Sequence, residues 1–176
     1  MTQKPIYRDV WGLGPGSGYP GAFPRGLINH VKKRWWGNRR AWLFSGSFKD
    51  NDGITIDIKP ELRPDCIANC EQLPFADESF DFVFLDPPYS EKEAQEKYGL
   101  RYINLLKVMN ESSRVCEPGG TLILLHRMIP FYHPRSNEHY KQMELQAIVG
   151  VYTIAGWTNM RALTVWRKRE NLSKWL

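Results

Sequence analysis

The chain has 176 residues and a net charge of +5, from 24 Lys and Arg against 19 Asp and Glu. Its length and its hydrophobic fraction of 42% fit one globular domain with a core and exclude a disordered or fibrous protein. The apolar runs are far shorter than the roughly 18 residues of a membrane span. No signal-peptide segment follows Met1. We therefore expect a single cytoplasmic domain over residues 1–176.

The charge is unevenly distributed along the chain. Residues 1–49 carry a net +8, residues 50–96 carry −10, and residues 97–176 carry +7. Basic ends around an acidic middle suit a polyanionic partner, although an ordinary solvated surface is the alternative. The three cysteines have no metal-ligand spacing with each other or with histidines, so we expect reduced thiols and no metal.

The first 40 residues predict a glycine-rich loop followed by a basic helix. Six glycines and three prolines fall between Gly12 and Gly26, which predicts a loop over residues 1–26. The apolar spacing over residues 27–36 predicts a short amphipathic helix with basic residues on its other face. No segment is left for a separate target-recognition domain.

The rest of the chain alternates between strand and helix patterns. Helices are predicted over residues 91–99 and 102–115, and apolar stretches over 147–155 and 162–166 predict a closing hairpin. This order predicts one α/β sheet that is mainly parallel, with a C-terminal antiparallel hairpin. The other predicted strands are residues 41–45, 53–58, 66–69, 80–85 and 121–125.

A tetrad, Asp86-Pro87-Pro88-Tyr89, directly follows the most apolar of these strands. The carboxyl ends of parallel strands line the ligand crevice of such a sheet. Because proline has no N–H group, the Asp86 carboxylate and the Pro87 carbonyl are acceptors without competing donors. This pair suits a planar amino group, and the ring of Tyr89 can stack on a flat heterocycle. A simple strand-ending turn is the alternative interpretation.

The tetrad resembles the catalytic motif of class I S-adenosylmethionine-dependent amino-methyltransferases, which methylate adenine N6, cytosine N4 or guanine N2. Residues 44–47 resemble the cofactor loop of this family, and Asp57 resembles the acid that holds the cofactor ribose. Residues 19–25 are similar to a segment that precedes the cofactor loop in DNA amino-methyltransferases. The resemblance implies a Rossmann-like fold with catalytic residues Asp86, Pro87, Pro88 and Tyr89. It also implies S-adenosylmethionine as the cofactor, held by Phe23, Pro24, Phe44, Ser45, Gly46, Ser47, Asp57, Asn69, Cys70 and Asp86.

The chain departs from the family pattern at three points. Phe48 replaces the second glycine of the cofactor loop, and Asn69 replaces the usual aspartate. Only ten residues separate Gly46 from Asp57, which is too short for a helical crossover between two parallel strands.

Basic clusters interleaved with tryptophans predict a nucleic-acid surface, with DNA favoured over RNA. A solvated basic face is the alternative. A homodimer, or a partner subunit that supplies target recognition, is compatible with the missing recognition domain. The residues predicted to contact nucleic acid are Lys32, Lys33, Arg34, Arg39, Arg40, Arg101, Arg127 and Arg135.

These observations predict methylation of a nucleobase amino group, with adenine N6 in DNA as the first choice. A base in a duplex has to be flipped out to reach such a pocket. No cysteine follows a proline, which disfavours methylation of cytosine C5 through a thiolate. The alternatives are cytosine N4 in DNA, guanine N2 in RNA, a free nucleotide, or a non-catalytic nucleic-acid-binding subunit.

Overall fold

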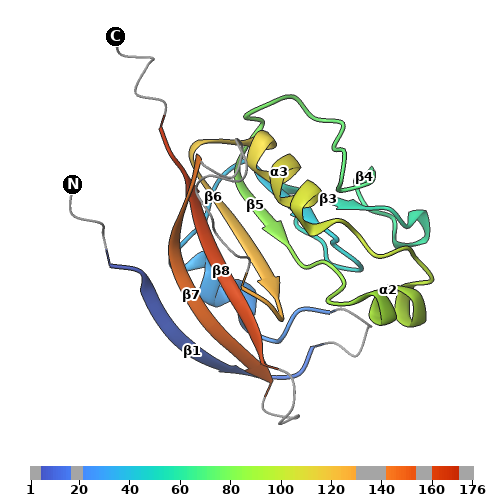
Figure 1. Cartoon of the computed structure of the whole chain (residues 1–176), viewed down its shortest axis with the longest axis horizontal. Coiled ribbons are helices and arrows are strands. Elements are labelled where there is room, and N and C mark those ends of the chain that lie inside the picture. The colour runs from blue at the N-terminus through green and yellow to red at the C-terminus, as the bar shows by residue number, and fades with distance from the viewer. Residues whose placement is uncertain (1–4, 17–21, 130–141, 154–159, 171–176) are drawn as a thin grey trace.

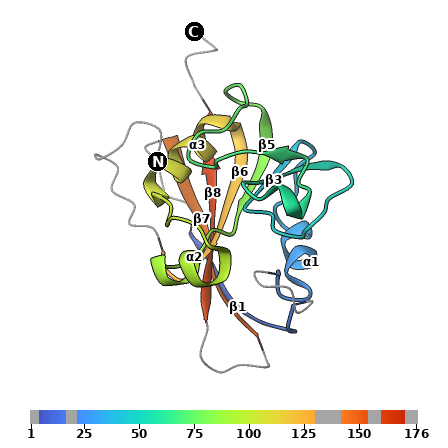
Figure 2. The same cartoon turned by 90° about the vertical axis from the view of Figure 1, so that its right-hand side faces the viewer.

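A computed structural model describes residues 5–16, 22–129, 142–153 and 160–170. An eight-stranded sheet forms the middle of the molecule, with helices on both of its faces (Figures 1 and 2). Helix α1 (Leu27–Lys32) lies on one face, and α2 (Glu91–Tyr98) and α3 (Leu105–Val115) lie on the other. A 3-10 turn, η1 (Pro60–Leu62), follows the third strand along the chain.

The sheet has the order β1-β7-β8-β6-β5-β2-β3-β4. Strands β2 to β6 pair in parallel, and β8 runs antiparallel to both β6 and β7. The predicted parallel sheet with a C-terminal antiparallel hairpin is therefore confirmed. The strands are β1 (Tyr7–Leu13), β2 (Arg40–Leu43), β3 (Gly53–Asp57), β4 (Cys66–Ile67), β5 (Phe80–Leu85), β6 (Cys116–His126), β7 (Met143–Thr153) and β8 (Arg161–Lys168).

Local sequence explains where the helices begin and end. Ser90 precedes α2, and its hydroxyl accepts from the Glu93 N–H, while Gly99 ends the helix with a φ of 64°. The Asn104 side chain caps α3 in the same way. At the other end of α3, the buried ammonium of Lys168 donates to the carbonyl oxygens of Ser113 and Cys116. This contact ties the last strand to the helix.

Strand β1 corrects the prediction of a loop over residues 1–26. Trp11 and Leu13 are buried in the core, while Val10 is 61% exposed on the other face. It pairs in parallel with β7, from Tyr7 opposite Ala147 onward. The glycines and prolines of the N-terminal region end this strand and do not prevent it. The predicted boundaries also shift elsewhere: β6 starts five residues earlier than expected, and the helix expected over residues 27–36 ends at Lys32.

No helix forms between β2 and β3, as the ten-residue spacing predicted. Aromatic side chains cover this part of the sheet instead, around the fully buried Trp42. The Phe48 ring lies 4.7 Å from the Trp42 ring and 5.1 Å from that of Phe23, and Trp36 lies 5.9 Å from Trp42. Phe48 therefore packs where a crossover helix is missing, which accounts for an aromatic residue at the expected glycine position.

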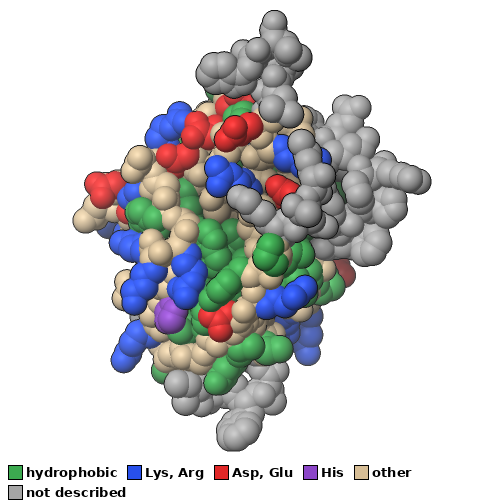
Figure 3. All heavy atoms as spheres, turned by 90° about the vertical axis from the view of Figure 1, so that its left-hand side faces the viewer, with side chains coloured by type: hydrophobic (Ala, Val, Ile, Leu, Met, Phe, Trp, Pro, Cys, Tyr) green, Lys and Arg blue, Asp and Glu red, His purple; other side chains and the backbone are tan. Residues whose placement is uncertain are grey.

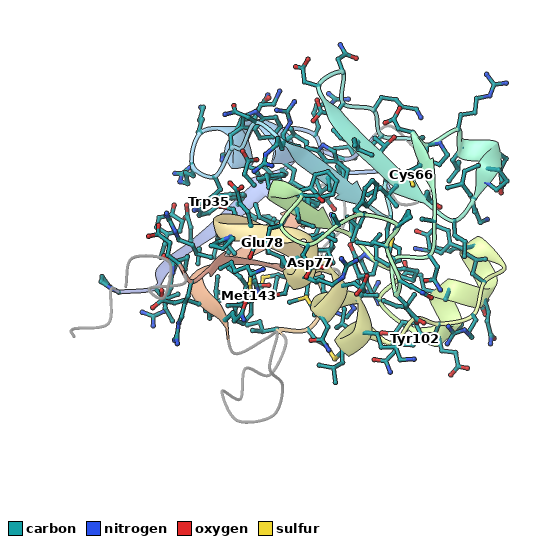
Figure 4. The ribbon with its side chains drawn as sticks, turned by 90° about the horizontal axis from the view of Figure 1, so that it is seen from above. Trp35, Cys66, Asp77, Glu78, Tyr102 and Met143 are labelled. Carbon is teal, nitrogen blue, oxygen red and sulfur yellow. The ribbon has the colours of Figure 1, made fainter. Side chains whose placement is uncertain are left out.

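The sheet separates two hydrophobic clusters. The cluster on the α1 side contains Trp11, Trp42 and Val31, and Trp35 packs against it. The cluster on the α3 side contains Met109 and Met143. Figure 4 shows Trp35 and Tyr102 well apart on the two sides of the sheet. Among the described helices, none has the length and apolar character to cross a membrane.

Candidate active site

A pocket of about 430 Å³ lies at the carboxyl ends of β2, β3 and β5. This is the edge of a parallel sheet at which ligands bind, because loops from neighbouring strands meet there. The wall formed after β2, β3 and β4 includes Phe44, Gly46, Asp57 and Asn69. The opposite wall comes from the tetrad after β5 and from residues of α2, β7 and β8, together with the residue that follows β6.

Asp57 organises the first wall. Its Oδ2 atom accepts from the Gly46 N–H at 2.9 Å, and its Oδ1 atom accepts from the Lys59 N–H at 3.0 Å. The turn after β2 has positive φ angles at Phe44 (57°) and Gly46 (54°), which bring the Gly46 N–H back to this carboxylate. A carboxylate oxygen has more than one acceptor site, so Asp57 retains capacity for ligand hydroxyl groups.

The residues predicted from the cofactor-loop resemblance divide between two cavities. Phe44 and Gly46 line the main pocket together with Asp57, Asn69, Cys70 and Asp86. The other predicted residues line a neighbouring hollow on the other side of the loop. Among residues 22–25, the described part of the segment before the loop, Ala22 lines both cavities. The structure thus places these predicted residues on the other side of the loop from the main pocket, and their contact with the cofactor stays a prediction. The residues that line only the second hollow are Phe23, Pro24, Ser45 and Ser47.

Asn69 and Cys70 form the far end of the first wall. The Asn69 Oδ1 atom accepts from the Glu71 N–H at 2.9 Å, which leaves the amide NH₂ group as its donor. Cys70 is buried, and burial raises the pKa of its thiol to about 12. A thiol with such a pKa stays protonated near neutral pH, so Cys70 contributes shape and not a nucleophile.

In the tetrad, the Tyr89 hydroxyl donates to Asp86 Oδ1 at 2.5 Å. Burial raises the pKa of Asp86 to about 7, and the bond from Tyr89 opposes this shift by stabilising the carboxylate. Burial also raises the pKa of Tyr89 well above its usual value, so the phenol keeps its proton and donates it. The Tyr89 N–H donates to Glu93 at 2.9 Å, which fixes the turn on α2.

Three residues outside the tetrad surround the Tyr89 side chain. Arg161, the first residue of β8, donates from Nη1 to the Tyr89 hydroxyl at 3.3 Å. The Arg127 guanidinium lies 5.5 Å from the centre of the Tyr89 ring, on one of its faces. The ring of the buried His126 lies at 5.3 Å and nearly perpendicular to that of Tyr89.

Arg161 was missed by the sequence analysis, although the hairpin contained a signal. A strand that returns antiparallel to β6 begins at the edge where β6 ends, so its first side chains reach the pocket. His126 follows the same logic as the last residue of β6. Its Nδ1 atom accepts from the Met128 N–H at 3.0 Å, and burial lowers the pKa of the ring, which favours the neutral form.

The predicted nucleic-acid contacts fall on different surfaces. Arg101 lines the pocket and forms an ion pair with Glu71 at 2.9 Å, and Arg127 also lines the pocket. Arg39 is exposed and forms an ion pair with Glu117. Arg40 is buried and donates to both oxygens of Asp50, so its guanidinium is engaged by a loop carboxylate and its nucleic-acid contact stays a prediction. Arg135 lies outside the described residues.

Lys32, Lys33 and Arg34 are exposed at the end of α1. The Lys32 ammonium lies 4.6 Å from the centre of the Trp36 ring, and the Arg34 guanidinium lies 5.8 Å from that of Trp11. Figure 3 shows Lys and Arg side chains gathered along one border of this side of the molecule. Within the described residues, no group of three or more His, Cys, Asp or Glu side chains is placed to hold a metal ion.

Residues 54–124 match a protein family described as a methyltransferase domain. The matched residues extend from β3 into β6 and make up less than half of the chain. A segment of 78 residues is 36% identical to sterol 4-C-methyltransferase strm-1 of Caenorhabditis elegans. That match covers 43% of this chain and 20% of the worm protein, so the chain spans only about a fifth of this relative.

Solved structures of methyltransferases have the same fold as this chain. A methyltransferase of Haloferax volcanii, solved with the activator Trm112, superposes with a TM-score of 0.56 at 15% identity, over 82% of this chain and 89% of the other. The 1,6-didemethyltoxoflavin-N1-methyltransferase of Burkholderia thailandensis, solved with S-adenosylhomocysteine, gives 0.53 at 10% identity, over 86% and 77%. The predicted Rossmann-like class I methyltransferase fold is therefore confirmed.

S-adenosylmethionine is the cofactor that the match to a methyltransferase domain indicates, and the first wall of the pocket fits it. The Asp57 carboxylate offers acceptors for ribose hydroxyl groups, and Ile58, Leu62 and Ile103 provide apolar surface for a purine ring. The Phe48 ring packs on the aromatic cluster and does not line this pocket, so the departure from the glycine pattern leaves the cofactor site open.

Proposed function

We propose that the protein transfers the methyl group of S-adenosylmethionine to the exocyclic amino group of a nucleobase, with adenine N6 in DNA as the first target. The observation that carries this proposal is that Asp86 lines the same pocket as Asp57, from the opposite wall. Asp86 therefore brings an acceptor for an amino group into the cavity that also contains the proposed cofactor site.

The tetrad supplies hydrogen-bond acceptors for an amino group. The ionised Asp86 carboxylate accepts one amino hydrogen, and Tyr89 donates to Oδ1 only, so Oδ2 remains available. We assign the Pro87 carbonyl as the second acceptor. Both bonds draw the nitrogen lone pair out of conjugation with the ring and direct it toward the methyl donor. The cofactor supplies an electrophilic methyl group, and the residues of the chain contribute orientation and acceptors.

Arg127 and Tyr89 restrict how a base can enter. One face of the Tyr89 ring carries the Arg127 guanidinium, so a base stacks on the opposite face or takes the place of the guanidinium. Arg127 is exposed and follows the end of β6, which gives it room to move. In this arrangement the Arg127 side chain moves aside when the base enters, and the base stacks on the Tyr89 ring.

Methylation of a sterol carbon is the second candidate, favoured by the sequence match to the worm sterol enzyme. A sterol is uncharged and offers no amino group. The pocket around Tyr89 contains two carboxyl groups and two guanidinium groups. They belong to Asp86, Glu93, Arg127 and Arg161. This polar composition supports the nucleobase.

The test is an incubation with a cofactor carrying a tritiated methyl group and, in parallel, duplex DNA, single-stranded DNA, RNA, free nucleotides and a sterol. Digestion and mass spectrometry of the nucleosides then identify the methylated atom. We expect N6-methyladenine, and Asp86→Asn should lower the rate at least about 100-fold because it removes the anionic acceptor. Asp52→Asn, at a side chain that is 85% exposed, is the matched control and should keep full activity. Label on a sterol carbon or on cytosine C5 contradicts the proposal.

A further inference from the structure

Glu93, on the first turn of α2, is a carboxylate at the pocket that the recognition of an amino group does not use. Its side chain is only 10% exposed, and it lines the pocket beside the tetrad. Burial alone would raise the pKa of this carboxyl group, but the bonds from Lys97 and from the Tyr89 N–H outweigh it, and the pKa lies below its usual value. Glu93 is therefore charged at neutral pH. A largely buried charge is costly, so its position needs an explanation.

The start of α2 explains this position only in part. Ser90 is the N-cap of the helix, and its hydroxyl accepts from the Glu93 N–H at 3.1 Å. In a capping box, the side chain of a glutamate at this third helical position accepts in return from the N–H of the capping residue. Here the Glu93 Oε2 atom accepts instead from the N–H of Tyr89, one residue earlier, at 2.9 Å. The carboxylate therefore holds the last residue of the tetrad as well as the helix.

Three hydrogen bonds connect the exposed side of α2 with Asp86. The Lys97 ammonium donates to Glu93 Oε1 at 2.5 Å, and the Tyr89 N–H donates to Oε2 of the same carboxylate. At its other end, the Tyr89 hydroxyl donates to Asp86 Oδ1 at 2.5 Å. Tyr89 is thus fixed at its backbone by Glu93 and at its hydroxyl by the proposed amino-group acceptor.

We propose that Glu93 is a positioning residue for the tetrad, which orients Tyr89 toward Asp86 and places a negative charge near the amino-group acceptor, with Lys97 as its counter-ion. The inference rests on the proposed function for what Asp86 binds. Burial is the main cause of the raised pKa of Asp86; the charge of Glu93 raises this pKa further, and the charge of Lys97 lowers it. The two residues of the pair therefore act on Asp86 in opposite directions.

Other titratable or charged groups also surround Asp86 and Tyr89. The Tyr89 hydroxyl and the Arg161 guanidinium both lower the pKa of Asp86. Substitutions at Glu93 and Lys97 leave these groups in place, so a change in the titration of Asp86 reports on the pair. The surrounding groups are Tyr89 on the same loop, Asp57 on the opposite wall, His126 and Arg127 at the end of β6, and Arg161 at the start of β8.

The experiment measures kcat/KM against pH for the unaltered protein and for variants of the pair. Glu93→Gln removes the charge but keeps an oxygen that can accept from the Tyr89 N–H. The rise of kcat/KM through about pH 7 should move to lower pH by about half a unit in Glu93→Gln, and to higher pH by a similar amount in Lys97→Gln. Glu93→Ala also removes the contact, so it should in addition lower kcat at least about tenfold because Tyr89 is no longer held in place.

The same helix supplies matched controls. Lys92 and Glu96 form an ion pair with the same spacing along α2 as Glu93 and Lys97, both side chains are exposed, and neither is among the described residues that line the pocket. Lys92→Gln and Glu96→Gln should leave the pH midpoint of kcat/KM unchanged. A residue that only caps the helix would change stability or rate without moving this midpoint. Unshifted midpoints in Glu93→Gln and Lys97→Gln therefore overturn the inference.

A carbon-13 NMR titration of the Asp86 carboxyl group gives a readout that needs no substrate. The signal is assigned by its absence from Asp86→Asn. Midpoints that move in opposite directions in Glu93→Gln and Lys97→Gln support the inference, whichever atom is methylated. Equal midpoints in all variants, with methyl on adenine N6, overturn the inference and keep the proposed function. Methyl transfer to a sterol carbon overturns the proposed function, and the NMR midpoints then still decide whether the pair acts on Asp86.

Discussion

At Asp86, burial and hydrogen bonding act on the same carboxyl group in opposite directions. Burial disfavours the charge and raises the pKa to about 7, and the Tyr89 hydroxyl favours it. A carboxylate is a better acceptor for an amino group than a neutral carboxyl group is. The proposed acceptor therefore gains its charge as the pH rises through about 7. A cationic cofactor in the same pocket favours the carboxylate further.

We predict that Asp86→Asn stabilises the fold at high pH. An unfolded aspartate has a pKa near 3.9, so between about pH 4 and pH 7 the native state holds a proton that the unfolded state has lost. The free energy of unfolding of the unaltered protein therefore falls over this interval. The asparagine variant should be more stable by about 2–4 kcal/mol at pH 8 and by little at pH 4, measured by urea unfolding. A stability difference that does not change with pH contradicts this assignment.

We also predict that cofactor binding depends on the charge of Asp86. S-adenosylmethionine carries a sulfonium charge and S-adenosylhomocysteine does not. Raising the pH through about 7 should tighten binding of the charged form about fivefold more than binding of the neutral form, which corresponds to ~1 kcal/mol of charge interaction. Calorimetry at pH 6 and pH 8 measures both constants. In Asp86→Asn the two forms should show the same pH dependence; a remaining difference assigns the effect to another group.

On the scale of secondary-structure elements, the loop between β2 and β3 combines cofactor binding with packing. Gly46 faces the pocket, and Phe48, two residues later, faces the aromatic cluster of Trp42 and Phe23. The loop thus lines the proposed cofactor pocket on one side and closes the core on the other, within the ten residues between Gly46 and Asp57.

Phe48→Gly, which restores the family pattern, should destabilise the protein without improving the cofactor site. The variant loses two aromatic contacts and gains backbone freedom in the unfolded state, so we expect a loss of about 2–3 kcal/mol in the free energy of unfolding. Ser47→Gly, at an exposed neighbour, is the control and should cost less than about 1 kcal/mol. Tighter binding of S-adenosylhomocysteine by Phe48→Gly, with unchanged stability, is the contrary outcome.

The elements that could be predicted are those whose sequence pattern depends on burial alone. Strand β5 is covered on both faces and is a nearly continuous apolar run, so its bounds were predicted correctly. Strand β1 alternates between exposed and buried residues and runs into glycines, and its partner is more than 130 residues away. Its existence depends on a pairing that no local pattern contains.

The same distinction applies to the site residues. Phe44, Asp57 and Asp86 end three parallel strands that are close in sequence, so the sheet order alone brings them to one pocket. Arg161 reaches that pocket only through the register of the hairpin. The buried Arg40 was predicted as a surface residue because sequence does not reveal its partner, Asp50.

For the molecule as a whole, the fold interleaves the charged segments, because β2 from the basic N-terminal part lies between β5 and β3 from the acidic middle. The acidic middle forms β3, β4, β5 and α2, whereas β1, α1 and β8 carry the basic ends. Basic side chains border the face seen in Figure 3. Under the proposed function, this basic border attracts the nucleic acid before any base is read. The basic cluster at the end of α1 is the part of this surface where cations also contact aromatic rings.

The contribution of that cluster is measurable as a salt dependence. Each phosphate contact on duplex DNA contributes about 0.9 to the slope of log K against log salt. Replacing Lys32, Lys33 and Arg34 together by glutamine should therefore lower the slope by about 2–3 units and weaken binding most at low salt. Fluorescence titration with duplex DNA at several salt concentrations gives the slope.

A matched variant removes the same charge from a different surface, through glutamine at the exposed residues Arg63, Lys92 and Lys107. Its slope should stay within one unit of that of the unaltered protein, because these side chains project from the acidic part of the chain and from the α2 and α3 side. If both triple variants lose the same slope, binding depends on net charge alone. The α1 cluster then has no specific part in holding the nucleic acid, whereas a loss confined to the first variant assigns the phosphate contacts to it.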